Sequence, residues 1–172
     1  DGKGDPEPVR NKRKSEGLLS YLAEHFGDEL IFAEDIQYKE LQGDALYDTL
    51  SNLVKGNHLR RHATGIYTIS EKTFSDDDLI VARYLKRYRH RIGFLRGASY
   101  AGMLGLADKP TAWHIATNKE SFKTANRKTR FLGKDIHIKG MPVEITDKNY
   151  IVLEAVDFLV QYKQCTTLPV DE

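Results

Sequence analysis

The stretch QGDALYDTLSNLVKGNHLRRHATGIYTI, residues 42–69, decides how the first half of this chain folds. Its aliphatic residues lie three or four positions apart, as on one face of a helix: Leu46, Leu50, Leu53 and Val54. Gly56 and Asn57 follow, and both residue types tolerate the left-handed backbone at which helices often end. The sequence therefore predicts a helix over 42–55.

A basic two-stranded hairpin is predicted directly after this helix. Segments 58–62 and 65–69 have the composition of strands, and Gly65 can take the positive φ that a tight turn between them requires. Upstream, the pattern indicates a helix over 14–26, a short strand over 30–32 and a short helix over 33–37. This order is typical of a winged helix-turn-helix.

The second half predicts a small α+β domain. Ser75 is expected to cap a helix over 76–90, followed by helices over 97–106 and 148–163. The residues expected on the buried face of the last helix are Ile151, Ala155, Phe158, Leu159 and Tyr162. Strands are expected over 92–95, 112–117, 130–132, 136–139 and 142–145. We divide the chain into a flexible leader or expression remnant (1–10), a winged helix-turn-helix domain (11–74) and an α+β domain (75–172).

The net charge, the cysteine content and the length of the apolar runs limit the classes of protein to which the chain can belong. The 172 residues carry a formal net charge of +1, so total charge gives no strong pull toward nucleic acid, although basic residues are clustered. Cys165 is the only cysteine, which excludes an internal disulfide and favours a reducing, cytoplasmic setting. No apolar run is long enough to predict a membrane span.

The predicted winged helix offers candidate contacts to double-stranded DNA. Recognition helices read base edges with their N-terminal residues, and Gln42 is of the type that contacts adenine. Phosphate, sugar or minor-groove contacts are assigned to Tyr47, Ser51, Lys55, Arg60 and Arg61, and an arm before the first helix supplies Arg10, Lys12, Arg13 and Lys14. Asp44 and Asp48 on the same helix face disfavour phosphate, so docking of a protein remains the alternative.

A second basic patch is predicted in the following domain. Its candidate residues, for a protein partner or nucleic acid, are Arg83, Lys86, Arg87, Arg89, Arg91, Arg127 and Arg130. The alternative is a solvated helix face, with Tyr84 and Tyr88 in the core.

Signatures of catalysis are missing from the sequence. There is no glycine-rich phosphate loop, nucleophile elbow or HExxH motif, and Glu144 lacks the lysine that a metal-dependent nuclease strand requires beside Asp135. His114 and His137 lie on predicted strands without partners at ligand spacing, which indicates structural histidines. We expect no enzymatic activity, no metal and no cofactor.

Residues 97–118 carry a resemblance to a known family. The helix GASYAGMLGL (97–106), Pro110 and the strand HIATN (114–118), with Arg127 and Arg130 after them, resemble the core of AbiEi-like antitoxins. These are antitoxins of type IV toxin–antitoxin and abortive-infection systems. The resemblance covers about 12–162, and Gly102 departs from it where a bulky residue is usual. For Gly97, Gly102 and Gly105 the expected role is close packing.

The resemblance implies a bifunctional repressor and antitoxin. The winged helix would bind promoter inverted repeats, as a homodimer or cooperatively, and repress its own operon. The second domain would counter a nucleotidyltransferase-like toxin, without a stable complex being assumed. An interaction module, whose winged helix and basic 83–96 helix both dock protein, stays the alternative.

Overall fold

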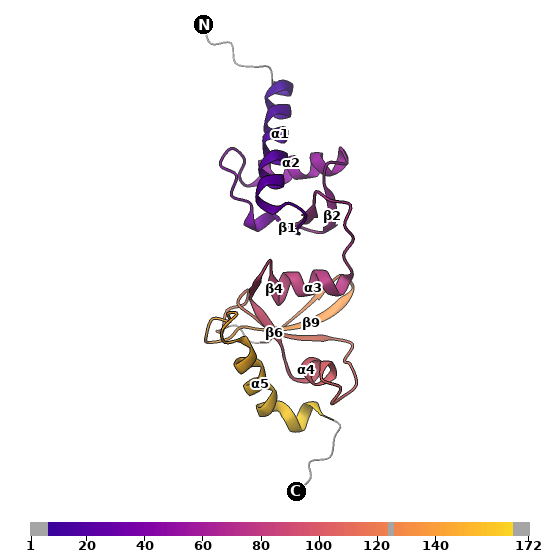
Figure 1. The fold of residues 1–172 in the computed structure, drawn as a ribbon, viewed down its shortest axis with the longest axis vertical. Helices are drawn as coiled ribbons and strands as arrows, with labels where there is room; N and C mark the ends of the chain where they lie inside the picture. Colours follow the sequence, from indigo (N-terminus) through magenta and orange to yellow (C-terminus); the bar gives the residue numbers. More distant parts are fainter. Residues whose placement is uncertain (1–6, 124–125, 167–172) are drawn as a thin grey trace. The chain divides into compact units, whose positions relative to one another are not determined.

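The computed structural model describes residues 7–123 and 126–166, with side chains from residue 13 onward. The chain divides into two compact units, Asp1–Phe74 and Ser75–Glu172 (Figure 1). Both combine helices with a small sheet, so the α+β class is confirmed. None of the helices in this part of the chain is both long and apolar enough to cross a membrane.

Over its described residues, 7–74, the first unit contains two α-helices and three short strands. Its elements are α1 (Glu7–Phe26), β1 (Ile31–Phe32), the 3₁₀ helix η1 (Ala33–Asp35), α2 (Asp44–Lys55), β2 (Arg60–Ala63) and β3 (Ile66–Thr68). The strands form an antiparallel sheet in the order β1-β3-β2. Gly65 has a φ of 74° in the turn, as the hairpin prediction requires. The strand predicted over 30–32 is confirmed as β1, which pairs with β3 of the hairpin.

The core of this unit comes from the leucine face that the sequence predicts. Leu46, Leu50 and Leu53 of α2 are buried against Leu18 and Leu22 of α1. Each fully buried leucine contributes about 2 kcal/mol relative to an exposed one. Because these residues face inward, the opposite side of α2 is left to solvent.

Three expectations for this unit are wrong. Residues 33–37 form only the 3₁₀ turn, because Ile36 takes an extended backbone conformation (φ −75°, ψ 115°) that ends it. Gln42 lies outside α2, since Gly43 takes φ 56°, ψ −137°, a conformation suited to glycine. The stretch 10–14 is no separate arm but part of α1, whose first turn tolerates Pro8.

The second unit is built on a four-stranded sheet. Its helices are α3 (Asp76–Tyr84), α4 (Gly97–Met103) and α5 (Tyr150–Cys165). Strands β6 (Gly93–Leu95), β7 (Trp113–Thr117), β8 (Arg127–Phe131) and β9 (Lys134–Lys139) pair in the order β6-β7-β9-β8, with β7 and β9 parallel. Strands β4 (Lys86–Arg87) and β5 (His90–Arg91) form a separate hairpin.

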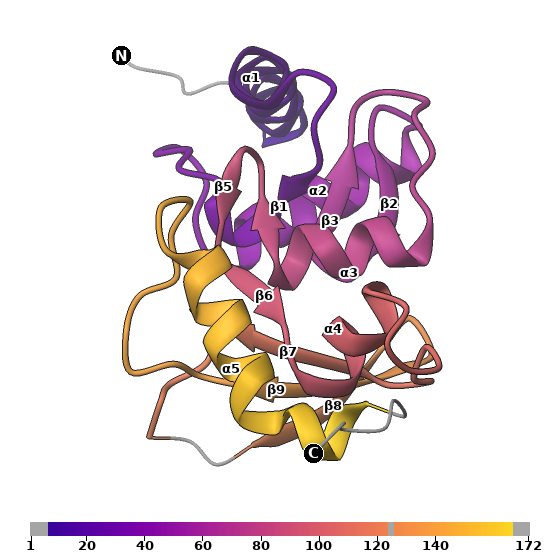
Figure 2. The same cartoon turned by 60° about the horizontal axis from the view of Figure 1, so that its bottom comes forward.

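Both faces of this sheet are covered by helices. Ile115 packs with Ile80 and Tyr84 of α3, whereas its neighbour Ala116 packs in a second cluster with Leu153 of α5. Successive residues of a strand point to opposite faces, so α3 and α5 lie on opposite sides. Figure 2 shows α5 crossing the strands on its side.

The helix predicted over 76–90 is wrong in its second half. Ser75 caps α3 as expected, but the helix ends at Tyr84. The Leu85 carbonyl accepts from the Ile92 and Gly93 amides (2.9 and 3.1 Å), and Tyr88 turns the β4–β5 hairpin at φ 52°. Most of the segment 83–91 therefore does not form a basic helix face.

Two further expectations fail near the end of the chain. Residues 142–145 are not a strand, because Asn118 satisfies the Ile145 backbone. On α5, Phe158 is buried as predicted, but Ile151 and Leu159 are 62% and 69% exposed.

Candidate nucleic-acid interface

The exposed face of α2 carries three of the ten residues that the sequence assigns to DNA. Tyr47 is 51% exposed, and Ser51 and Lys55 are also exposed. They lie four residues apart, on the side away from the leucine face. Asp44 and Asp48 are exposed on the same helix. The face therefore combines hydroxyl groups and one cation with two carboxylates, which makes its charge mixed.

The hairpin beside α2 presents two arginines. Arg60 and Arg61 are exposed on β2, which is an edge strand of its sheet. Arg61 donates from Nε to the Ala63 carbonyl (3.4 Å) and from its terminal nitrogen to Thr64 Oγ1 (3.0 Å). These bonds hold its guanidinium over the turn and leave donors free for a phosphate.

A groove links the end of α2 to this hairpin. It encloses about 520 Å³ and is lined by Val54, Asn57, Leu59, Arg60, Arg61, Ile69, Ser70 and Glu71. Both arginines belong to its wall, while Lys55 follows Val54 on the helix. The end of α2, through Val54, and the basic strand β2 thus line one surface, which we call the α2–β2 groove.

His62 is a residue of this hairpin that sequence reasoning missed. Its Nε2 lies 2.9 Å from Oγ1 of the fully buried Thr68, and its ring meets Phe74 edge-on at 5.3 Å. Burial, and then the charge of Arg60, lowers the pKa of the imidazole. Through the contact with Thr68, the His62 side chain joins the two strands. The sequence did contain a signal for this inward position: His62 follows the exposed Arg61, and successive residues of a strand point to opposite faces.

Of the residues assigned to DNA whose side chains the structure describes, only Arg60 and Arg61 are in the groove's lining. Arg10 and Lys12 belong to α1, but their side chains are outside the described part of the chain. Arg13 is exposed and Lys14 half-buried on the same helix. Gln42 is exposed in the loop before α2.

The residues of the second basic patch come from several elements, and most of them contact groups of their own unit. Arg83 lies over the rings of Tyr84 and Phe131, and Arg91 over that of Tyr150. Such stacking occupies the guanidinium within the unit. Arg87 is only 8% exposed.

Other members of that patch are also engaged with their own unit. Arg127 forms an ion pair with Glu120 at 2.8 Å. Arg130 donates to the Gly133 carbonyl and lies 3.8 Å from Asp135. Lys86 and Arg89 are exposed on and beside the β4–β5 hairpin. The seven residues are thus distributed over α3, the hairpin and β8.

His114 and His137 are brought together, which their sequence spacing did not indicate. They are in register on parallel strands β7 and β9, with ring centroids 4.6 Å apart. Burial, followed by the charges of His137 and Arg96, lowers the pKa of His114. Among the described residues, no group of three or more His, Cys, Asp or Glu is placed to hold a metal ion.

Comparisons of the chain with protein-family models, curated proteins and solved structures found no match.

Proposed function

We propose that the chain is a DNA-binding transcriptional repressor whose first unit is a winged helix-turn-helix. The observation that carries this proposal is the α2–β2 groove, where an exposed helix meets Arg60 and Arg61 on an edge strand. A helix with an adjacent basic hairpin has the layout of a reader that lays its helix in the major groove and its wing on the backbone. The 3₁₀ turn η1 would stand in for the short second helix.

The mechanism is occupation of a promoter through phosphate contacts. Arg60, Arg61 and Lys55 would neutralise phosphates, while Tyr47 and Ser51 would donate to phosphate or sugar oxygens. Gln42 would reach a base from the loop before α2. A single winged helix supplies few such contacts, so two copies on an inverted repeat are expected.

The antitoxin role rests on the resemblance at 97–118. It supports autoregulation of a type IV toxin–antitoxin operon in the cytoplasm, with unit Ser75–Glu172 countering a nucleotidyltransferase-like toxin. The proposed role requires no catalysis by this chain. An interaction module remains the second candidate, favoured by the exposed carboxylates of Asp44 and Asp48 on α2.

Gel retardation of duplex DNA from upstream of the chain's own gene tests the repressor. We expect retardation that weakens steeply with salt, by a factor of about 10³ between 50 and 200 mM for six phosphate contacts. The double variant Arg60→Ala, Arg61→Ala should bind at least about tenfold more weakly and show a shallower salt dependence. Lys39→Ala, an exposed lysine outside the groove's lining, is the control.

The two candidates give different outcomes. Retardation that the arginine variant leaves unchanged would contradict the wing assignment. The interaction module would be favoured if the wild-type chain did not retard DNA and instead bound a protein through Asp44 and Asp48.

A further inference from the structure

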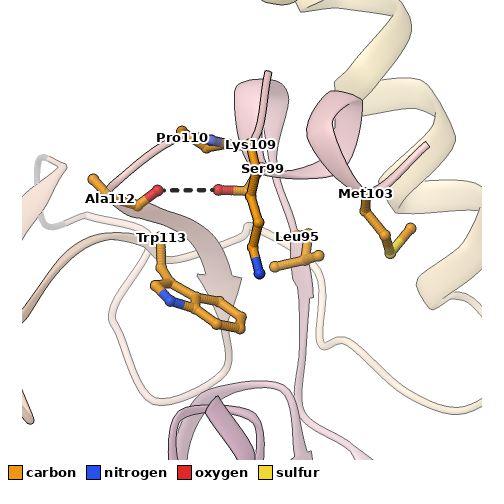
Figure 3. A pocket seen from close by; sticks show the side chains of 7 residues that line it. All are labelled: Leu95, Ser99, Met103, Lys109, Pro110, Ala112 and Trp113. Carbon is orange, nitrogen blue, oxygen red and sulfur yellow. Dashed lines mark hydrogen bonds between the residues drawn. The ribbon is translucent and has the colours of Figure 1, made fainter. Parts of the chain in front are cut away.

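A cavity of about 240 Å³ opens in the second unit at the start of β7 (Figure 3). Its lining is largely apolar and contains one charged side chain, and it consists of Leu95, Ser99, Met103, Lys109, Pro110, Ala112 and Trp113. Apolar walls with a few placed polar groups are characteristic of small-molecule sites. We call this cavity the Trp113 pocket.

The walls of the Trp113 pocket are held by specific contacts. Ser99 Oγ accepts from the His114 amide (2.8 Å) and donates to the Ala112 carbonyl (3.4 Å), the bond dashed in Figure 3. Gly102 allows the loop before β7 to approach α4, because a Cβ there would lie 3.0 Å from Lys109 Cα and 3.2 Å from Pro110 Cδ. The pocket is therefore built by the fold.

Its charge comes from Lys109. The Lys109 side chain lines the pocket together with Leu95 and Trp113 (Figure 3), but it is 78% exposed, so its amine lies at the open side of the cavity. The Lys109 Nζ lies 3.9 Å from Asp77 Oδ2, and Asp77 also forms a closer ion pair with Lys134. Two lysines thus share one carboxylate, and among the described residues Lys109 is the only charged side chain in the pocket's lining.

We propose that the Trp113 pocket binds a small aromatic carboxylate. A flat ring lies against the indole of Trp113 and the aliphatic side chains of Leu95 and Met103, where offset stacking is favourable. The carboxylate pairs with Lys109. The volume is below the range typical of drug-sized ligands, so one ring with a short acidic side chain fits and a nucleotide does not. The proposal is independent of DNA binding.

Trp113 reports on its own pocket, because it is the only tryptophan among the 172 residues. The experiment titrates the full chain with phenylacetate under selective tryptophan excitation. We expect a saturable change in emission with a dissociation constant on the order of 1 mM, as befits a ligand of this size. Phenylmethanol, a neutral analogue of similar shape, should bind about fivefold more weakly.

Substitution of Lys109 tests whether its charge binds the ligand. Lys109→Met keeps a long apolar side chain and should weaken phenylacetate about fivefold while leaving phenylmethanol unchanged. Lys148→Met removes an exposed lysine outside the pocket's lining and should leave both titrations unchanged.

Two results would overturn the proposal. If phenylacetate gave no saturable change in the wild-type chain, the pocket would not be a site for this class of ligand. If phenylacetate and phenylmethanol bound equally well, selection of an anion by Lys109 would be wrong. This second comparison uses the wild-type chain and holds even if the Lys109 variant fails to fold.

Discussion

The side chain of Asn118 makes the two backbone hydrogen bonds at Ile145 that a neighbouring strand would otherwise make. Its Nδ2 donates to the Ile145 carbonyl at 2.7 Å, and its Oδ1 accepts from the Ile145 amide at 2.8 Å. Opposed residues in an antiparallel pair exchange two bonds in the same way. Ile145 is buried, so its backbone groups need these partners. The sequence predicts a strand here because it shows apolar alternation but not which group satisfies the backbone.

Removing the Asn118 amide should therefore be costly. Asn118→Ala should lower the free energy of unfolding by about 2–3 kcal/mol, because two buried backbone groups lose their partners. Urea unfolding followed by circular dichroism measures the change. Asn118→Asp should also destabilise, because a carboxylate oxygen would then face the Ile145 carbonyl, whereas the exposed Asn126→Ala should be neutral within about 0.5 kcal/mol. Equal stability of the Asn118→Ala and Asn126→Ala variants would refute the role.

His62 makes the stability of the first unit depend on pH. Burial and Arg60 lower its folded pKa below the ordinary value of 6.5, so the unfolded chain binds the proton more readily. The contribution is complete above about pH 6.5 and is lost as pH falls through the folded pKa. We expect unit Asp1–Phe74 to be less stable at pH 5 than at pH 8.

His62→Gln, which keeps a polar side chain beside Thr68, should flatten this dependence. Hydrogen exchange of the β2 and β3 amides, measured across pH with the intrinsic rate corrected, follows the unit separately. His58→Gln is the matched control, because His58 is exposed in the turn before β2. An unchanged pH profile in the His62 variant would show that other groups set it.

The end of α3 and the start of β6 lie so close together that a side chain at position 93 would not fit. A Cβ on Gly93 would lie 2.1 Å from the Tyr84 carbonyl oxygen and 2.5 Å from that of Ala116. These oxygens belong to the end of α3 and to β7. Glycine at position 93 therefore lets the chain turn from the helix into the sheet, and a larger residue must separate the two.

Gly93→Ala should destabilise the second unit by about 3 kcal/mol or more, since backbone atoms on both sides must move. Gly105→Ala is the comparison, because Gly105 has φ 73° but nothing within 4 Å of its Cβ position. It should cost only about 1 kcal/mol, from the left-handed backbone. Thermal unfolding of both variants separates close packing from conformational strain. Similar losses would contradict the distinction.

This contrast also corrects one expectation about the glycines of α4 and its end. Close packing is confirmed for Gly102, whereas Gly97 combines a left-handed backbone (φ 44°) with a position where a Cβ would meet the Gln161 and Cys165 side chains. Close packing is wrong for Gly105, which is needed for its backbone conformation. A sequence alone does not distinguish these two uses of glycine.

The features predicted correctly from the sequence are those that depend on local patterns of residues. The leucine face of α2, the Gly65 turn and the Ser75 cap each depend on residues close together in the chain, and all three are confirmed. The cap includes reciprocal bonds between Ser75 and Asp78, a capping box. From such signals, both ends of α2 and β3 and the start of α3 are predicted to within two residues.

Features set by distant residues were missed. The inner side of α5 includes polar groups: Glu154 accepts from the Leu95 amide at 3.1 Å, and Asp157 pairs with Arg96 at 2.9 Å. Burial raises the pKa of Glu154. Apolar periodicity therefore placed Ile151 and Leu159 inside, whereas they are exposed. The pairing of His114 with His137 likewise depends on a parallel register that no local pattern contains.

At the scale of the whole molecule, the two units divide the proposed work between them. The α2–β2 groove lies entirely in unit Asp1–Phe74, while the segment that resembles the antitoxin core lies in unit Ser75–Glu172. Each unit has its own buried cluster. If the proposed function holds, repression and neutralisation of the toxin should be separable by substitution.

The double variant Arg60→Ala, Arg61→Ala should then derepress a reporter driven by the operon promoter while still protecting cells that express the adjacent toxin. Gly93→Ala should do the reverse, because it strains the second unit and leaves the α2–β2 groove intact. Reporter activity and survival, measured in the same strains with equal protein levels, test both halves. Loss of both activities in the arginine variant would mean that protection itself requires DNA binding, and the division of work between the units would be wrong.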